Sequence, residues 1–277
     1  ARQDIAETRD EIQRYHRLDI VTYHDGSYRI EGSALNQRLC LLHWLRRAMR
    51  LCPQFVSHQF TPALKTALKQ QGIARPLYDD TNLRALISFC SRKLQRPFDC
   101  RDVQFLQLYL QYCLMQHHLG NTPQFSSVQR NWTQSRGEYF TAQEIVRHWK
   151  RRVPQGTHSD EQLFLALLFM MLRTPDPVLD KHQQDQRLRR AIVRMVARFR
   201  AQTGMNFSDE QGLTDQLYIH LAQALDRSLF EIGIDNSLPE EIHRLYPRLL
   251  RTTKEALFEL EAEFGLRFSD EEMSLVA

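Results

Sequence analysis

The chain repeats itself at long range, and this repeat limits the folds open to it. Three short blocks recur in the same order at a spacing of about 110 residues. The paired blocks are 96–99 with 205–208, 104–114 with 216–225, and 159–163 with 269–273. The middle pair aligns Tyr109 with His220. A shared order and a shared spacing predict two tandem domains of about 100 residues each.

The repeated blocks are predicted to be helical. Apolar residues recur with the 3.6-residue period of a helix in 104–115, 188–199 and 213–225. Glycine is scarce, at 10 of 277 residues, and proline and glycine fall between the periodic stretches. Ser159 and Ser269 are each followed three residues later by glutamine or glutamate, which predicts a capping box at a helix start. These features predict an all-α fold of two similar helical bundles.

The N-terminal region has a different pattern. A helical stretch at 5–15 precedes two short β-rich runs, 18–23 and 27–31, which flank Asp25-Gly26. Asp-Gly supplies the positive φ angles of a tight hairpin turn. A helix followed by a two-stranded wing is typical of the C-terminal part of a winged helix. The alternative is an amphipathic helix with a hairpin and no role in nucleic-acid binding.

These patterns divide the chain into four parts. We expect the C-terminal part of a winged-helix module at 1–35, connecting helices at 36–74, a first helical repeat domain at 75–177 and a second at 178–277. In the first part, Arg9 and Arg14 are the candidate DNA contacts. The chain lacks an initiator methionine and ends in an apolar run, so we expect a fragment cut at both ends, with the second domain truncated.

Composition narrows the class of protein further. The net charge of +4 is below what a nucleic-acid-binding domain usually shows, so we expect DNA binding to need the full-length N-terminal module. No apolar run approaches the ~18 residues of a membrane span, and no leader-like apolar segment is present. The five cysteines include no C-x-x-C pair, which is typical of free thiols in a reducing cytoplasm. We therefore expect a cytoplasmic protein with no membrane contact.

The sequence shows no pattern of enzyme chemistry. It contains no phosphate-binding loop, no nucleophile elbow and no histidine pairing of a metal site. We predict that the protein is not an enzyme and has no cofactor and no metal. Arginines recur every three or four residues from Arg187 to Arg198, a stripe that indicates either a solvated face or one that meets an acidic partner surface. His117-His118 is interpreted as a helix C-terminal cap.

The second repeat resembles the PTS regulation domain of bacterial transcriptional regulators and antiterminators. The residues that carry the resemblance are Leu217-Tyr218-Ile219-His220-Leu221-Ala222-Gln223-Ala224-Leu225-Asp226-Arg227, Ile234-Asp235-Asn236-Ser237-Leu238-Pro239-Glu240-Glu241-Ile242, Tyr246-Pro247-Arg248-Leu249 and Phe264-Gly265-Leu266-Arg267-Phe268-Ser269-Asp270-Glu271-Glu272. The first repeat follows the same order more weakly.

The resemblance implies a fold and a mode of regulation. Each such domain is a bundle of about five helices, and paired domains form homodimers. Histidines near the dimer interface accept phosphate from HPr or from a sugar-specific EIIB protein. Phosphorylation then resets the dimer and the activity of the attached nucleic-acid-binding module, because a phosphoryl group adds about −1.5 to −2 charge at a packed interface.

The chain departs from the family pattern at most of the acceptor positions. The family has two histidine positions per domain. In the first repeat they fall on Tyr109 and on Leu167 or Leu168, which cannot accept phosphate in this way. In the second repeat the first position is His220, with Arg227 retained, and the other would lie beyond Ala277. His220 is therefore the candidate phosphoacceptor and Arg227 its supporting residue.

His220 also has a simpler interpretation. It shares an apolar stripe with Leu213, Leu217 and Ala224, which is typical of a histidine held in a core. Burial there would disfavour a charged imidazolium, so we expect modification of His220 to be weak or absent. Two functions stay open: the sensing part of a transcriptional regulator, or a protein-interaction scaffold that descends from such regulators and is not phosphorylated. An RNA-binding antiterminator fits less well, because a helix and wing precede the repeats.

Overall fold

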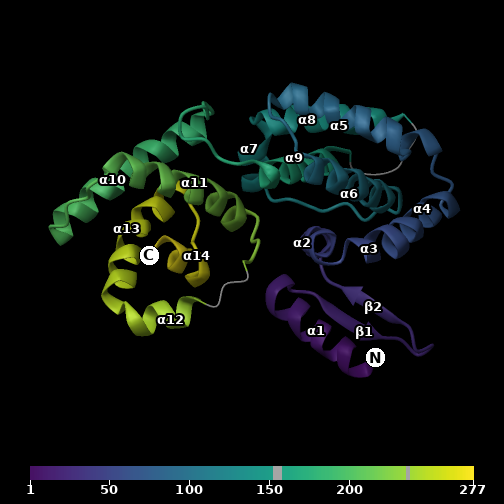
Figure 1. Ribbon diagram of the computed structural model, residues 1–277, viewed down its shortest axis with the longest axis horizontal. Coiled ribbons are helices and arrows are strands. Elements are labelled where there is room, and N and C mark those ends of the chain that lie inside the picture. The colour runs from purple at the N-terminus through teal and green to yellow at the C-terminus, as the bar shows by residue number, and fades with distance from the viewer. Residues whose placement is uncertain (152–157, 235–237) are drawn as a thin grey trace. The chain divides into compact units, whose positions relative to one another are not determined.

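The computed structural model describes residues 1–151, 158–234 and 238–277. The described chain is helical almost throughout, with one two-stranded sheet near its N-terminus (Figure 1). It divides into two compact units, Ala1–Leu172 (unit 1) and Arg173–Ala277 (unit 2). The predicted all-α class is confirmed.

Helices account for most of both units. Unit 1 contains α1 (Arg2–His16), β1 (Asp19–Thr22), β2 (Tyr28–Glu31), α2 (Ala34–Leu51), α3 (Pro53–Phe55), the π-helix η1 (Val56–Phe60), α4 (Thr61–Gln70), the 3₁₀-helix η2 (Arg75–Leu77), α5 (Asp80–Leu94), α6 (Cys100–His118), α7 (Ser127–Gln134), α8 (Gly137–Lys150) and α9 (His158–Leu172). Unit 2 contains α10 (Gln183–Thr203), α11 (Glu210–Leu229), α12 (Leu238–Leu245), α13 (Pro247–Phe264) and α14 (Asp270–Val276). The predicted helices at 104–115, 188–199 and 213–225 lie within α6, α10 and α11.

The repeat is visible in the packing of the helices. The five helices α5 to α9 match α10 to α14 in order, among the residues described. The same pairs touch in both units: α5 with α6 and α8, and α8 with α9, correspond to α10 with α11 and α13, and α13 with α14. Tyr109 lies in the middle of α6, and His220 lies in the middle of α11. The prediction of two similar bundles is therefore confirmed.

Of the two predicted capping residues, Ser269 caps a helix and Ser159 does not. Ser269 is the N-cap of α14, and its hydroxyl oxygen accepts a hydrogen bond from the backbone N–H of Glu272 at 3.2 Å. Ser159 does not cap α9, because that helix already begins at His158. The position before His158 lies outside the described residues. In the first repeat the prediction of Ser159 as the cap was therefore wrong by at least two residues.

The N-terminal helix and hairpin form as predicted. Strands β1 and β2 pair antiparallel, with Thr22 opposite Tyr28. The turn between them uses Gly26 at φ +82°, and Asp25 accepts a hydrogen bond from the backbone N–H of Ser27 at 2.9 Å. A small apolar cluster of Ile12, Leu18 and Cys40 joins α1 and the start of β1 to α2. The hairpin is thereby tied to the first long helix that follows it.

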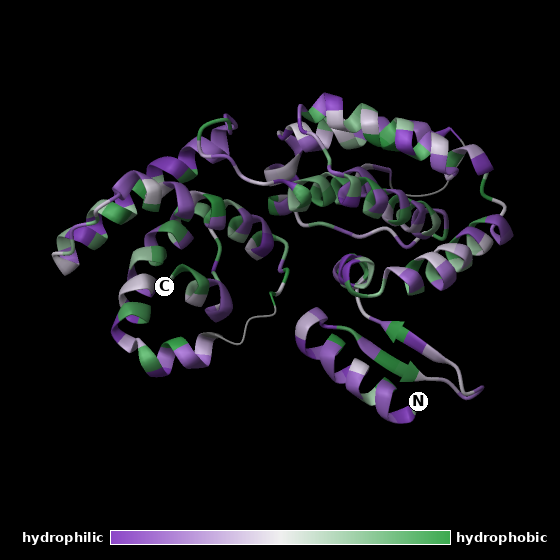
Figure 2. Ribbon diagram, in the orientation of Figure 1, coloured by the Kyte–Doolittle hydropathy of each residue, from purple (hydrophilic) through white to green (hydrophobic). Residues whose placement is uncertain are grey.

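Helix α9 forms the centre of unit 1. Every residue from 163 to 170 is at most 2% exposed, and the helix is mainly hydrophobic in colour in Figure 2. A helix that is apolar on all sides is stable only when other helices surround it. The second family position, Leu168, therefore lies in the core at 0% exposure.

The arginine stripe of α10 meets an acidic surface within its own unit. Arg187 and Arg194 both pair with Glu263 of α13, at 3.2 and 2.9 Å. Arg198 pairs with Glu259, one helical turn earlier on α13. The arginines of the stripe thus pair with α13 of the same chain while Arg194 and Arg198 remain exposed, and contact with an acidic partner surface stays a prediction.

Candidate functional site

The candidate site of unit 2 brings together His220, Arg227 and Glu272. Nε of Arg227 donates to Oε1 of Glu272 at 2.5 Å, and its Nη2 donates to Oε2 at 3.0 Å. Nε2 of His220 lies 3.5 Å from the same Oε2. Glu272 is 3% exposed, whereas the side chain of His220 is 26% exposed. A buried carboxylate thus links a half-exposed imidazole to an arginine.

Local structure places these three side chains. His220 and Arg227 are seven residues apart on α11, two turns along one helix face. Glu272 is the third residue of α14, which begins at the cap supplied by Ser269. The capped start of α14 therefore directs this glutamate at α11. Glu272 itself was not singled out from the sequence, although the acidic start of the last helix was part of the family pattern.

The charge of Glu272 is stabilised by its neighbours. Burial by itself raises the pKa of a carboxyl group. The contacts of Glu272 with His220 and Arg227 outweigh that effect and hold its pKa below the ordinary value of 4.5. The carboxylate is therefore ionised at neutral pH.

The lowered pKa of Glu272 predicts an acid-sensitive unit 2. A carboxyl group with a lower pKa in the folded state stabilises the fold fully above about pH 4.5, and this contribution disappears as pH falls through the folded pKa. We expect hydrogen exchange of the α11 and α14 amides to accelerate below pH 4.5, and Glu272→Gln to flatten that dependence. The exposed Asp270 of the same helix provides the control. An Asp270→Asn variant that flattened the profile equally would contradict the assignment.

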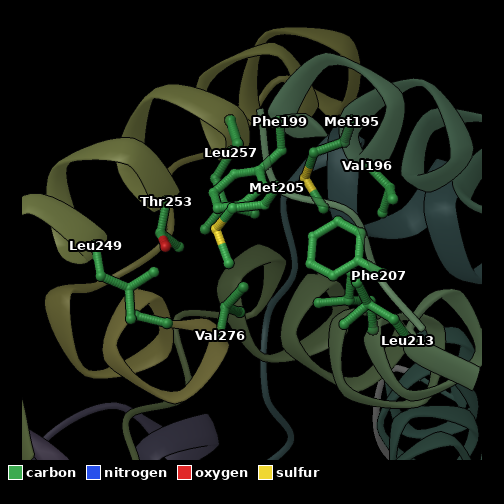
Figure 3. Close-up of a pocket in the computed structure, with 13 residues that line it drawn as sticks. Met195, Val196, Phe199, Met205, Phe207, Leu213, Leu249, Thr253, Leu257 and Val276 are labelled. Carbon is green, nitrogen blue, oxygen red and sulfur yellow. The ribbon is translucent and has the colours of Figure 1, made fainter. Parts of the chain in front are cut away.

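His220 is less enclosed than its apolar stripe suggested. Ala224 is buried, but Leu213 and Leu217 are only partly buried. Both leucines line an apolar pocket of about 190 Å³ in unit 2, together with side chains from α10 and α13 (Figure 3). The expectation of a fully buried core histidine is therefore corrected: the side chain of His220 is 26% exposed, although its Nε2 is buried.

We assign no ligand to this pocket. Figure 3 shows Phe199, Met205 and Phe207 converging on it, and Thr253 brings a hydroxyl group to its wall. Val276, the last residue of α14, also lines it.

The position in unit 1 that aligns with His220 is closed to solvent. Tyr109 is 0% exposed, and its hydroxyl group donates to the backbone carbonyl of Arg38 on α2. Burial raises the pKa of Tyr109 well above its ordinary value. The other family position, Leu168, is buried as well. Helix α2 therefore covers the first family position of this repeat.

A second arginine–glutamate pair lies beside Tyr109. Nη1 of Arg38 donates to both oxygens of Glu161, at 2.8 and 2.7 Å, and Nη2 donates to the carbonyl of Asn121 at 3.0 Å. Both side chains are at most 1% exposed. Glu161 on α9 is the neighbour of Gln162, the residue that aligns with Glu272 on α14, and its arginine comes from α2, because Gln116 occupies the position that matches Arg227. The sequence analysis missed this pair, because Arg38 lies outside the repeat.

The two candidate DNA contacts, Arg9 and Arg14, differ in whether their guanidinium groups are engaged in ion pairs within the chain. Nε of Arg9 donates to Oδ1 of Asp19 at 2.7 Å, so its guanidinium is engaged within the N-terminal region. Arg14 is exposed, and its guanidinium carbon lies 5.3 Å from the ring centroid of Tyr15. Of the two, Arg14 keeps the more accessible charge.

His117 lies in the last turn of α6, where the sequence placed it, but it is buried. It is 0% exposed, and its Nε2 lies 3.1 Å from Nδ1 of His158. Its Nδ1 lies 3.0 Å from the hydroxyl oxygen of Thr122. Burial, followed by the neighbouring His158, lowers the pKa of His117 to about 4. It therefore joins the end of α6 to the start of α9 as a neutral ring.

The described residues hold neither a metal site nor a membrane-spanning helix. No group of three or more histidine, cysteine, aspartate or glutamate side chains in them is arranged to hold a metal ion. None of the helices found there has the length and apolar character needed to cross a bilayer. Buried Cys40, Cys90 and Cys113 are free thiols.

The sequence matches the PRD domain twice, over residues 84–171 and 193–277. These ranges contain both candidate sites and cover more than half of the chain, so the chain belongs to the PRD domain family. It is also 62% identical over 274 residues to the stationary phase-inducible protein CsiE of Escherichia coli (strain K12). The match covers 99% of this chain and 64% of that relative. The predicted family is therefore confirmed.

Proposed function

We propose that this chain is the sensing and dimerisation part of a PRD-containing transcriptional regulator, with His220 as its phosphoacceptor. The observation that carries the proposal is the half-exposed ring of His220 beside Glu272 and Arg227. It lies at the position where the family pattern has a histidine. The donor is HPr or an EIIB protein of the PTS, and the role in the cell is a regulatory, non-enzymatic one in stationary phase.

Phosphorylation of His220 would act on the packing of α11 against α14. A phosphoryl group on His220 adds about −1.5 to −2 charge next to the ionised Glu272. The phosphoryl group would compete with that carboxylate for Arg227. Because this ion pair joins α11 to α14, phosphorylation would change how the two helices pack.

A non-phosphorylated scaffold is the second candidate. It is favoured by unit 1, where Tyr109 and Leu168 are buried and α2 closes the first position. In this alternative, both domains act through protein contacts alone. The two candidates differ in whether His220 takes a phosphoryl group.

The N-terminal region is proposed as part of a winged-helix module that contacts DNA in the full-length protein. The observations behind this proposal are the order helix, strand, strand and the exposed Arg14. Binding through one arginine is weak, so most of the contact must come from the rest of the module. The chain spans 64% of the length of its relative, which leaves room for such a module.

We predict that the protein is a homodimer. Both units expose large apolar side chains on matching helix pairs: Phe89 and Phe140 on α5 and α8, and Val193 and Phe258 on α10 and α13. Light scattering at micromolar concentration should give about twice the chain mass of 32.8 kDa. Phe258→Asp should lower that mass, because a charge on an apolar contact opposes association.

Phe55→Asp is the control for this experiment. Phe55 is also exposed, at 52%, but lies on α3, outside the repeated helix pairs. A mass of 32.8 kDa for the unsubstituted chain would contradict the prediction of a dimer. An equal effect of both substitutions would contradict the assignment of the interface.

A further inference from the structure

The two ring nitrogens of His220 have different surroundings. Nε2 is buried and makes no hydrogen bond within the described residues, but it lies 3.5 Å from Oε2 of Glu272. Nδ1 also has no hydrogen-bond partner there and, unlike Nε2, keeps contact with solvent. Since the side chain as a whole is 26% exposed, a donor can reach the ring from the Nδ1 side.

Glu272 is held firmly enough to define one side of that ring. Its two oxygens accept from Nε and Nη2 of Arg227, and its backbone N–H donates to Ser269. A carboxylate beside one imidazole nitrogen favours the tautomer that carries the proton on that nitrogen. The neutral ring then has its proton on Nε2 and its lone pair on Nδ1.

We propose that Nδ1 of His220 is the atom that takes the phosphoryl group, and that Glu272 is a positioning residue that keeps the proton on Nε2. The proposal rests on the proposed function, because it names the atom and the orienting group at the same site. Arg227 acts one step further away, by fixing the carboxylate.

The transfer balances without a further reactant. The lone pair of Nδ1 attacks the phosphorus of a phosphohistidine on the donor protein, and a new N–P bond forms. The donor's N–P bond breaks, and its electron pair stays on the donor imidazole. The proton on Nε2 does not move. The phosphorylated ring is then an imidazolium whose Nε2–H faces the carboxylate of Glu272, which offsets its positive charge.

Nitrogen-resolved NMR tests this proposal directly. Protein with ¹⁵N-labelled histidine is treated with phosphoramidate, a small phosphoryl donor that needs no partner protein, and long-range ¹H–¹⁵N spectra are recorded before and after. The His220 signals are assigned by their loss in His220→Ala. We expect the Nε2–H tautomer before treatment and phosphorus on Nδ1 afterwards.

Substitutions separate positioning from mere stability. Glu272→Gln should abolish the tautomer preference and slow phosphorylation on the order of tenfold. Glu272→Asp should restore part of the preference, and Asp270→Asn, which removes an exposed carboxylate from the same helix, should change neither. If Glu272→Gln does not fold, the unsubstituted protein still tests the proposal. Its tautomer before treatment and the nitrogen that carries phosphorus afterwards must then be Nε2–H and Nδ1.

The outcomes distinguish this inference from the proposed function. Phosphorus on Nε2, no label on His220 from phosphoramidate, or an unchanged tautomer in folded Glu272→Gln would overturn the inference. Label on Nδ1 from phosphoramidate but none from the PTS donor proteins would support the inference and refute the proposed function. Label from the donor proteins on Nε2 would support the proposed function and refute the inference.

Discussion

Replacing Arg38 with methionine is expected to lower the unfolding free energy of unit 1 by about 3–5 kcal/mol. The substitution leaves Glu161 as an unpaired buried carboxylate and the carbonyl of Asn121 without its donor. The pKa of Arg38 is raised above its ordinary value even though burial opposes its charge, because Glu161 is so close. Tryptophan fluorescence in urea measures the effect in unit 1 alone, since Trp44, Trp132 and Trp149 all lie there.

Two further variants test the cause. Replacing both partners, Arg38→Met with Glu161→Leu, should recover much of the loss, because no charge then remains buried. Lys65→Met is the control, since its pair with Asp80 at 3.1 Å is exposed and worth at most about 1 kcal/mol. Equal losses for Arg38→Met and Lys65→Met would show that α2 is not held to α9 by this pair.

Placing a histidine at the second family position of unit 1 should damage the fold and create no phosphoacceptor. Leu168 is 0% exposed in the centre of α9. Leu168→His removes packed methyl groups and buries a polar ring, which we expect to cost about 2–5 kcal/mol. Urea unfolding and acid-labile phosphate after incubation with the donor proteins measure the two effects.

Val128→His is the matched control. Val128 is 61% exposed on α7 of the same unit, so a histidine there should change stability by less than about 0.5 kcal/mol. If Leu168→His folded with unchanged stability and gained phosphate, the position would be open to a donor. The conclusion that the family positions of unit 1 are closed to a phosphoryl donor would then be wrong.

The fold could be predicted from the sequence because its signals are periodic and repeated. The 3.6-residue spacing in α6, α10 and α11 and the repeat of blocks at about 110 residues can both be read directly from the order of residues. The hairpin was predictable because Asp25-Gly26 specifies its turn. Residues whose role follows from local spacing were therefore found.

The site was predicted only in part, because its decisive contacts join distant segments. The pattern selected His220 and Arg227, which lie on one helix, but not Glu272, which comes from another. In the same way, Arg38 reaches Glu161 across 123 residues of sequence, so no spacing rule could pair them. Spacing also could not show that Leu213 and Leu217 are only partly buried, and the exposure of His220 was consequently underestimated.

Mapping phosphate by unit tests the central claim that the two domains have diverged, with unit 1 closed and unit 2 keeping an acceptor. The protein is incubated with HPr, the first PTS enzyme and phosphoenolpyruvate, and acid-labile phosphate is located by mass spectrometry. The account predicts phosphate on His220, its loss in His220→Ala, and none within 1–172. Phosphate within 1–172, or none on a folded, donor-exposed chain, would contradict it, and the second result would favour the scaffold.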